Sequence, residues 1–246
     1  MMKRVMEPEE HLFVAVKNNH TTDISTEIIQ TLQQRVRSVQ TWFLDLDDNH
    51  APSPAKKIAK RAIGTSHFSP RYLQWCGSTA FKLVRSGKSV ESEAWKEYVD
   101  RFLRNEDALA EVQRLFTPEY SRQSLYPGVE EFCGLVSDAQ RFYVTRNIAE
   151  VASAYASILN FDGFFPESYN KEKVVEKYLK RNPHVQKYGV EGDSEEDGVM
   201  VDVLQFYGKE VIAFYSTETI QEESFDPWFN YVIEKDRTFL VDLLKR

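Results

Sequence analysis

The segment WFLDLDDN, from Trp42 to Asn49, constrains the fold more than any other part of this 246-residue chain. Together with Thr41 it forms a short, unbroken apolar run that turns acidic within a few residues. Such a run is typical of a strand buried on both faces of a parallel sheet. Because side chains alternate along a strand, Asp45 and Asp47 are expected on the same side. The segment therefore predicts two neighbouring carboxylates at the end of a buried strand.

Strand and helix patterns alternate through the second half of the chain. We predict helices over 128–138, 147–159 and 171–181. We predict strands over 141–145, 161–165, 186–191, 210–215 and 229–233. This alternation implies an α/β fold with a Rossmann-like three-layer core, in which helices cover both faces of a parallel sheet. Ligands of such sheets bind at the carboxyl ends of the strands.

Two further parts flank this pattern. Residues 1–22 are mixed and polar and are expected to form a loosely organised arm, followed by a helix that begins near Asp23. Residues 51–124 lack strand signals and are rich in helix-forming residues. Helices are expected there near 54–63, 71–86, 91–104 and 106–115. We therefore predict an arm and helix at 1–40, a Rossmann-like core at 41–50 and 125–246, and a smaller all-helical domain at 51–124.

Composition excludes several classes of protein. The formal net charge of −7 argues against a nucleic-acid-binding protein, which would normally carry a basic surface. No apolar run reaches the roughly 18 residues of a membrane span, and the N-terminus lacks the apolar stretch of a secretory signal. The two cysteines, Cys76 and Cys133, are expected to be reduced thiols. We therefore expect a cytoplasmic protein without nucleic-acid or membrane partners.

The acidic end of the first strand is the first candidate site. Two carboxylates so close at a buried strand end repel one another unless a proton or a cation intervenes. Magnesium suits them, because it prefers carboxylate, carbonyl and water oxygens. Asp45 would be placed to attack phosphorus, and Asp47 to protonate a leaving alkoxide and later activate water. An acidic loop without chemistry is the alternative for this segment taken alone.

Three later segments also fall at or just after strand ends. Thr145-Arg146-Asn147 offers a hydroxyl and backbone N–H groups to a phosphate, although Thr145 or Asn147 would equally serve as a helix cap. A lysine, either Lys171 or Lys173, begins the next helix and would neutralise negative charge at the site. Each of these signals is weak when it is taken alone.

The last segment, VEGDSEEDG, follows another short apolar strand. Gly192 permits a close approach of the backbone, and Asp193 and Asp197 can converge on one ion if the chain turns helically between them. An acidic surface loop is the alternative, and we prefer it for Glu195 and Glu196. With Asp45 and Asp47, this loop would complete a metal site made of oxygen ligands.

The four segments occur in the order of the four motifs of the haloacid dehalogenase-like superfamily, which the chain resembles. The resemblance covers roughly 41–50 and 125–235, in the motifs FLDLDDN, FYVTRN, a lysine near 171, and VEGDSEED. The helical block 51–124 is similar to the cap that gives members of this superfamily their substrate selectivity. A lone Asp-x-Asp would be weak evidence, whereas four ordered motifs at sensible spacings are strong evidence.

The resemblance implies a magnesium-dependent phosphomonoesterase that acts through an aspartyl-phosphate on a small phosphorylated metabolite. It implies that Asp45 is the nucleophile, Asp47 the general acid and base, and Lys171 the residue that stabilises charge. Thr145, with Arg146 and Asn147 beside it, would bind the phosphate. It also implies a magnesium shell made by the following residues: Asp45, Asp47 (through its backbone carbonyl), Asp193 and Asp197.

Asn49 departs from the pattern, because phosphatases of the superfamily commonly have threonine at this position. A catalytically weak binding or regulatory protein therefore remains an alternative. So does a phosphonatase or phosphomutase, and a phosphonatase would use a lysine of the block 51–124. The available lysines are Lys56, Lys57, Lys60 and Lys82. The role of residues 1–40 stays open between packing on the core and a homodimer contact. His50 is expected either at the entrance of the pocket or as a hydrogen-bonded residue without a chemical role.

Overall fold

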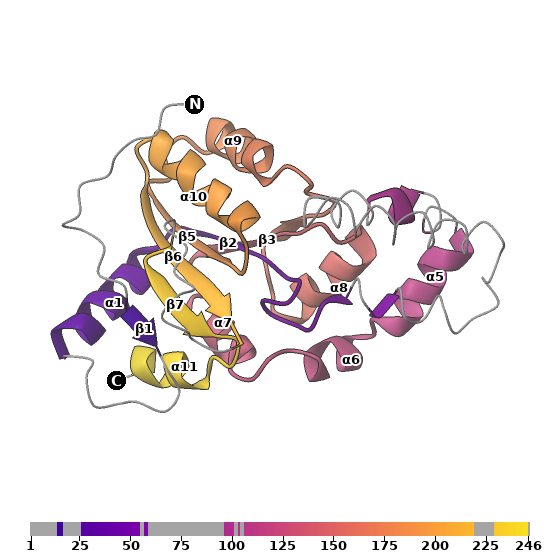
Figure 1. Cartoon of the computed structure of the whole chain (residues 1–246), viewed down its shortest axis with the longest axis horizontal. Helices are drawn as coiled ribbons and strands as arrows, with labels where there is room; N and C mark the ends of the chain where they lie inside the picture. Colours follow the sequence, from indigo (N-terminus) through magenta and orange to yellow (C-terminus); the bar gives the residue numbers. More distant parts are fainter. Residues whose placement is uncertain are drawn as a thin grey trace, which may run out of the picture.

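A seven-stranded, all-parallel sheet forms the centre of the described structure (Figure 1). The computed structural model describes residues 14–16, 26–54, 57–58, 96–100, 103, 106–218 and 229–245. The strands are β1 (Val14–Val16), β2 (Thr41–Leu44), β3 (Gln140–Val144), β4 (Gly163–Phe165), β5 (Lys187–Gly192), β6 (Glu210–Thr217) and β7 (Tyr231–Glu234). Their order in the sheet is β1-β7-β6-β5-β2-β3-β4. The strand β2 therefore lies in the interior of the sheet, between β5 and β3.

Helices cover both faces of this sheet. The helices are α1 (Thr26–Ser38), α5 (Glu106–Leu115), α6 (Pro118–Gln123), α7 (Val129–Leu135), α8 (Ala149–Ile158), α9 (Lys171–Arg181), α10 (Glu195–Phe206) and α11 (Thr238–Lys245). The helices α9 and α10 lie on one face, whereas α1, α7 and α11 lie on the other (Figure 1). Among the described helices, none has the length and apolarity that a membrane crossing requires.

Alternation along β2 explains why this strand reads as a continuous apolar run. Trp42 and Leu44 point into the core beneath α1, α7 and α11, and Phe43 points into the core beneath α9 and α10. All three side chains are fully buried. Trp42 stacks on Phe214 with ring centroids 5.8 Å apart. Because both faces are packed, the three positions before Asp45 are apolar, and the polar residue that begins β2, Thr41, is hydrogen-bonded to Tyr178.

The expected α/β class and three-layer core are confirmed, and so is most of the element order. The helix predicted over 171–181 has the same bounds in the structure, and the predicted strands match β3, β4, β5, β6 and β7 to within about three residues. The loosely organised arm expected at 1–22 contains a strand that was not predicted, because β1 pairs with β7 at the sheet edge. The preference for an acidic loop at Glu195 and Glu196 is also wrong, because both residues begin α10. The helix α11 was not predicted.

The block 51–124 is helical wherever an element is described. The helix α5 has the bounds predicted for it, and residues 96–100 are helical within the predicted 91–104. The helix α6 follows α5, with Thr117 as its cap, and contacts α8. The helix predicted over 71–86 and most of those over 54–63 and 91–104 lie outside the described residues. The division of the chain into arm, core and helical cap stays a prediction.

Candidate active site

Asp45 is the first residue after the buried strand β2, and its carboxyl group meets a lysine from another layer of the fold. The backbone N–H of Asp45 donates to the carbonyl of Glu191 at 2.9 Å, which continues the pairing of β2 with β5. The Nζ atom of Lys171 donates to Asp45 Oδ1 at 2.8 Å and to Asp197 Oδ1 at 2.5 Å. All three side chains are buried. The structure therefore brings three of the predicted site residues into direct contact.

The structure distinguishes Lys171 from its rival Lys173. Asn170 caps α9, and its side chain accepts a hydrogen bond from the backbone N–H of Lys173. Helix geometry then turns Lys171 toward the strand ends, while the side chain of Lys173 is exposed. The lysine that contacts Asp45 is the first residue of α9.

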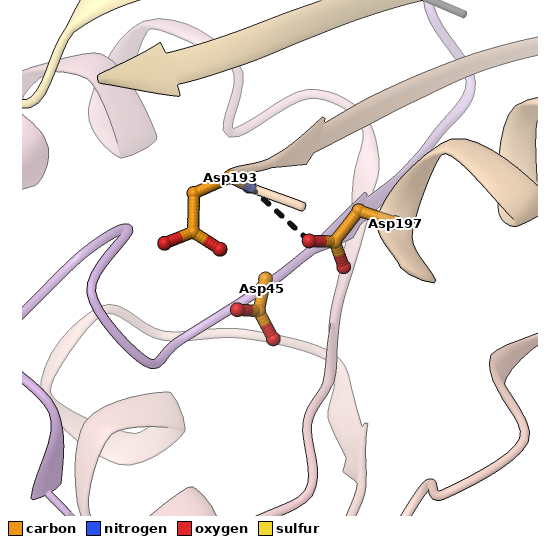
Figure 2. A group of neighbouring side chains, drawn as sticks. All are labelled: Asp45, Asp193 and Asp197. Carbon is orange, nitrogen blue, oxygen red and sulfur yellow. Dashed lines mark hydrogen bonds between the residues drawn. The ribbon is translucent and has the colours of Figure 1, made fainter. Parts of the chain in front are cut away.

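Asp193 and Asp197 come to the same place through a turn at the start of α10 (Figure 2). Asp197 Oδ2 accepts hydrogen bonds from the backbone N–H of Asp193 at 3.1 Å and from Ser194 Oγ at 2.7 Å. Gly192 makes this turn possible, because a Cβ atom there would lie 2.3 Å from the Cβ atom of Asp197. The predicted helical turn between the two aspartates is therefore present.

Three of these carboxylates form one cluster. Oxygen atoms of Asp45, Asp193 and Asp197 all lie within 4.8 Å of one another (Figure 2). Burial raises the pKa of Asp45 well above its usual value; the Lys171 ammonium opposes this rise, and the charges of Asp197 and Asp193 add to it. Burial and the charge of Asp197 likewise raise the pKa of Asp193 to about 7. The cluster concentrates more negative charge than one lysine neutralises.

This cluster has the chemistry of a site for a hard divalent cation. Its donors are carboxylate oxygens from three separate points of the chain, and Mg²⁺ and Ca²⁺ prefer such oxygens. The raised pKa values of Asp45 and Asp193 show that ionising all three groups without a further cation costs free energy. The residues present therefore fit a magnesium ion.

Asp47 lies apart from this cluster and is held by other partners. Its Oδ1 atom accepts from Ser53 Oγ at 3.1 Å, and its Oδ2 atom accepts from Thr145 Oγ1 at 3.2 Å and from the Asn147 side-chain amide. Burial raises the pKa of Asp47, although Arg146 and these hydrogen bonds lower it in part. The Asp47 side chain is therefore held between Ser53 and the segment that follows β3.

Thr145 precedes α8 but is not its cap, which is Ile148, and a phosphate-binding role for Thr145 stays a prediction. Its Oγ1 atom accepts from the backbone N–H of Asn147 at 3.1 Å, as a turn-forming residue does, and donates to Asp47. Its own N–H donates to Phe165 at the end of β4. Thr145 and Asn147 are both fully buried at the strand end. The local turn and the contact with the site are two consequences of one geometry.

Arg146 is the partly exposed member of this segment. Its Nη1 atom lies 3.3 Å from Glu196 Oε2 in the first turn of α10. Burial lowers the pKa of Arg146. The charge of Glu196 opposes this effect most strongly, followed by the charges of Asp45, Asp47 and Asp197, and together they raise the pKa. The guanidinium of Arg146 therefore lies beside the acidic site and is partly exposed to solvent.

A buried polar network beneath the acidic loop was not predicted from the sequence. His50 is fully buried and is not at a pocket entrance; its Nε2 atom lies 3.2 Å from Glu191 Oε2, and its Nδ1 atom lies 2.9 Å from Tyr143 Oη. Arg237 forms an ion pair with the other oxygen of Glu191. Burial alone would raise the pKa of Glu191, but Arg237 and His50 lower it to about 2. The signal available in the sequence was a glutamate inside an apolar strand.

Comparison with solved structures shows the fold. No protein-family model matches the chain, and no curated protein sequence matches it. Cytosolic 5'-nucleotidase IIIB bound to cytidine aligns with a TM-score of 0.59 at 12% identity, over 89% of this chain and 89% of that chain. This likeness, together with the parallel sheet, shows that the chain has the haloacid dehalogenase-like fold.

Two other solved structures align more loosely. A haloacid dehalogenase-like hydrolase from Burkholderia xenovorans LB400 gives a TM-score of 0.49 at 10% identity, over 84% of this chain and 97% of that chain. Phosphoserine phosphatase in its apo form gives 0.44 at 14% identity, over 85% of this chain and 98% of that chain. Since identities this low establish the fold alone, the chemistry has to be argued from the site.

Proposed function

We propose that this protein is a magnesium-dependent phosphomonoesterase that acts through an aspartyl-phosphate on a small phosphorylated metabolite. The observation that carries the proposal is the pair Asp45 and Asp47. Asp45 belongs to the carboxylate cluster and is paired with Lys171, whereas Asp47, two residues later, is held by Ser53, Thr145 and Asn147. Two acids with different surroundings are what a nucleophile and a general acid require.

In the first step, a carboxylate oxygen of Asp45 attacks phosphorus and the bond from phosphorus to the ester oxygen breaks. Protonated Asp47 gives its proton to the departing alkoxide, which leaves as an alcohol. Lys171 neutralises charge on Asp45 and on the transferring group. The burial that raises the pKa of Asp47 supports this role, because it favours the protonated form that the step needs.

In the second step, water attacks the phosphorus of the aspartyl-phosphate. Asp47, now ionised, accepts the proton of this water, and inorganic phosphate leaves as Asp45 returns to its carboxylate form. Hydrogen bonds from Thr145 and Asn147 hold Asp47 in one place for both transfers. Arg146, partly exposed beside the site, would bind phosphate oxygens.

Magnesium would be held by Asp45, Asp193 and Asp197, with the backbone carbonyl of Asp47 as a further ligand, as the resemblance implies. When bound, it would orient the phosphate and offset negative charge. The same fold supports dehalogenation, in which no alkoxide needs a proton. Asp47, a second carboxyl group held by Ser53, Thr145 and Asn147, is the feature that favours phosphate esters over that reaction.

The proposed substrate is a small phosphate ester, and the screen that tests it should include nucleoside monophosphates because of the 5'-nucleotidase likeness. A phosphonatase lysine has no support in the described residues. Lys57 lies 3.5 Å above the ring of Tyr120, and Lys56, Lys60 and Lys82 lie outside the described residues. The alternatives of a phosphomutase and of a catalytically weak regulatory protein are outcomes of the same screen.

The test is phosphate release from a panel of sugar phosphates, amino-acid phosphates and nucleoside monophosphates, with and without Mg²⁺. We expect magnesium-dependent release from at least one class and none from Asp45→Asn. Hydrolysis that persists unchanged in Asp45→Asn would exclude the proposed nucleophile. A panel without turnover by folded protein that binds Mg²⁺ would favour the regulatory alternative.

A further inference from the structure

The loop that follows Asp45 is tied to the far end of the chain by buried polar contacts. Arg237 lies just before α11 and is fully buried. Its Nη2 atom donates to Asn49 Oδ1 at 2.8 Å and to the Asn49 carbonyl at 3.2 Å. Two contacts from one guanidinium to a single residue fix both the side chain and the backbone of Asn49.

Asn49 in turn binds the backbone of Asp45. Its Nδ2 atom donates to the backbone carbonyl of Asp45 at 3.2 Å. The backbone N–H of Asp45 donates to the carbonyl of Glu191. The backbone of Asp45 is therefore held at both its N–H and its carbonyl group.

Glu191 closes the arrangement, because it also binds the guanidinium. Its Oε1 atom accepts from Arg237 Nε at 2.9 Å and from Nη2 at 2.5 Å, and its Oε2 atom lies 3.2 Å from His50 Nε2. Arg237, Glu191, Asn49 and His50 are all fully buried. We call these four residues the buried network. A planar, forked guanidinium suits this place, because it can bind a carboxylate and an amide oxygen together.

The backbone of Arg237 is anchored by the segment that precedes α7. The N–H of Arg237 donates to the carbonyl of Pro127 at 2.7 Å. Gly128 has a φ of 77°, and a Cβ atom there would lie 2.6 Å from the carbonyl carbon of Arg237. The segment before α11 thus packs directly on the backbone that leads into α7, so Arg237 has little freedom to move.

We propose that Asn49 is a positioning residue for the proposed reaction, and that Arg237 fixes Asn49 so that it aims the carboxylate of Asp45. The inference rests on the proposed function. The amide of Asn49 carries its acceptor and its donor on two separate atoms, so that it binds Arg237 through Oδ1 and the Asp45 carbonyl through Nδ2 at the same time. Asn49, which departs from the superfamily pattern, would then help to orient the nucleophile Asp45.

The test uses Asn49→Ala, which removes both side-chain contacts, and Asn49→Asp, which keeps an acceptor for Arg237 but replaces the donor to Asp45. The second variant changes only the donor, so a folded protein from either variant tests the contact with the Asp45 carbonyl. Ser216→Ala is the matched control, because Ser216 on β6 bonds the same Nη2 atom at 2.9 Å. Thermal unfolding and circular dichroism accompany each variant.

We expect kcat to fall by about 10- to 100-fold in both Asn49 variants, with KM within about twofold, because a small displacement of a nucleophile affects the chemical step. Ser216→Ala should keep both constants near those of the wild-type protein. Beryllofluoride, which mimics a phosphoryl group on aspartate, gives a readout without turnover. Its magnesium-dependent signal in ¹⁹F NMR should weaken in the Asn49 variants.

Wild-type kcat in a folded Asn49 variant, or an equal loss in Ser216→Ala, would overturn the inference and leave the proposed function intact. A rise of KM in the Asn49 variants without a loss of kcat would also overturn the inference. A wild-type protein with neither turnover nor a beryllofluoride adduct would instead refute the proposed function. The two failures are thereby distinguishable.

Discussion

The Nζ atom of Lys171 lies between Asp45 and Asp197, 2.8 Å from the first carboxylate and 2.5 Å from the second. Asp197 in turn binds the backbone N–H of Asp193. One buried ammonium therefore connects the end of β2 with the first turn of α10. Because burial alone would lower the pKa of Lys171, its raised pKa reflects the charges of Asp197 and Asp45.

Removal of this ammonium should affect both stability and catalysis. In Lys171→Met we expect the free energy of unfolding of the metal-free protein to fall by about 3 kcal/mol, because two buried carboxylates lose their partner. We expect kcat to fall by at least about 100-fold. Urea unfolding and phosphate release measure the two effects. Lys173→Ala, at an exposed position, is the control and should change stability by less than about 0.5 kcal/mol.

Replacement of Asp47 should act on the leaving group. In Asp47→Asn we expect the hydrolysis of alkyl phosphates to fall by about 100- to 10,000-fold, because the alkoxide then leaves without a proton. The loss of kcat/KM, which reports the first step and not the later attack of water, should be much smaller for p-nitrophenyl phosphate, since its leaving group needs no proton. Asp48→Asn is the control, because it keeps an acceptor for the backbone N–H of Ser53. Equal losses for both substrates would contradict the role of Asp47 as a general acid.

Stabilisation by magnesium should depend on pH. The pKa of Asp193 is raised from its ordinary 3.8 to about 7 in the folded, metal-free protein. Its contribution to the stability of that state is therefore present below about pH 4 and is lost as the pH rises through about 7. Magnesium binds the ionised form, so the Tm gained with Mg²⁺ should be larger at pH 8 than at pH 5. Thermal shifts that are equal at both pH values, or that survive in Asp193→Asn, would argue against this site.

Gly192 should tolerate no side chain. In Gly192→Ala the new Cβ atom would overlap Asp197, so we expect a loss of about 1–3 kcal/mol in stability and weaker Mg²⁺ binding by calorimetry. Gly134→Ala is the matched control, because a Cβ atom there meets nothing within 4 Å and the position lies inside the helix α7. Alanine in that helix should leave stability unchanged or raise it by about 0.5–1 kcal/mol. Similar effects of the two substitutions would exclude the steric explanation.

Sequence patterns were sufficient where one local cause dominates. The strand β2 is a run of residues buried on both faces, and α9 has a strong cap and a clear periodicity, so both were predicted. The site residues could be placed because each follows a strand end, where a parallel sheet brings them together. Their chemical roles remain predictions that the experiments above test.

Features that depend on distant partners were missed. The strand β1 has three residues in a polar arm, and its pairing with β7 gives no local signal. Glu195 and Glu196 were read as a loop, although acidic residues are common in the first turn of a helix such as α10. Arg237 and Glu191 are 46 residues apart, and no local pattern predicts that they pair.

The pairing of β1 with β7 also bears on the order in which the chain folds. Val14 lies beside Tyr231, so β1 has no partner strand until more than 200 further residues have been made. During synthesis this segment has to wait while β2, β3, β4, β5 and β6 assemble in succession. Contacts of such sequence separation form slowly, because a long loop has to close before they are gained. The first described strand to leave the ribosome should therefore be the last to join the sheet.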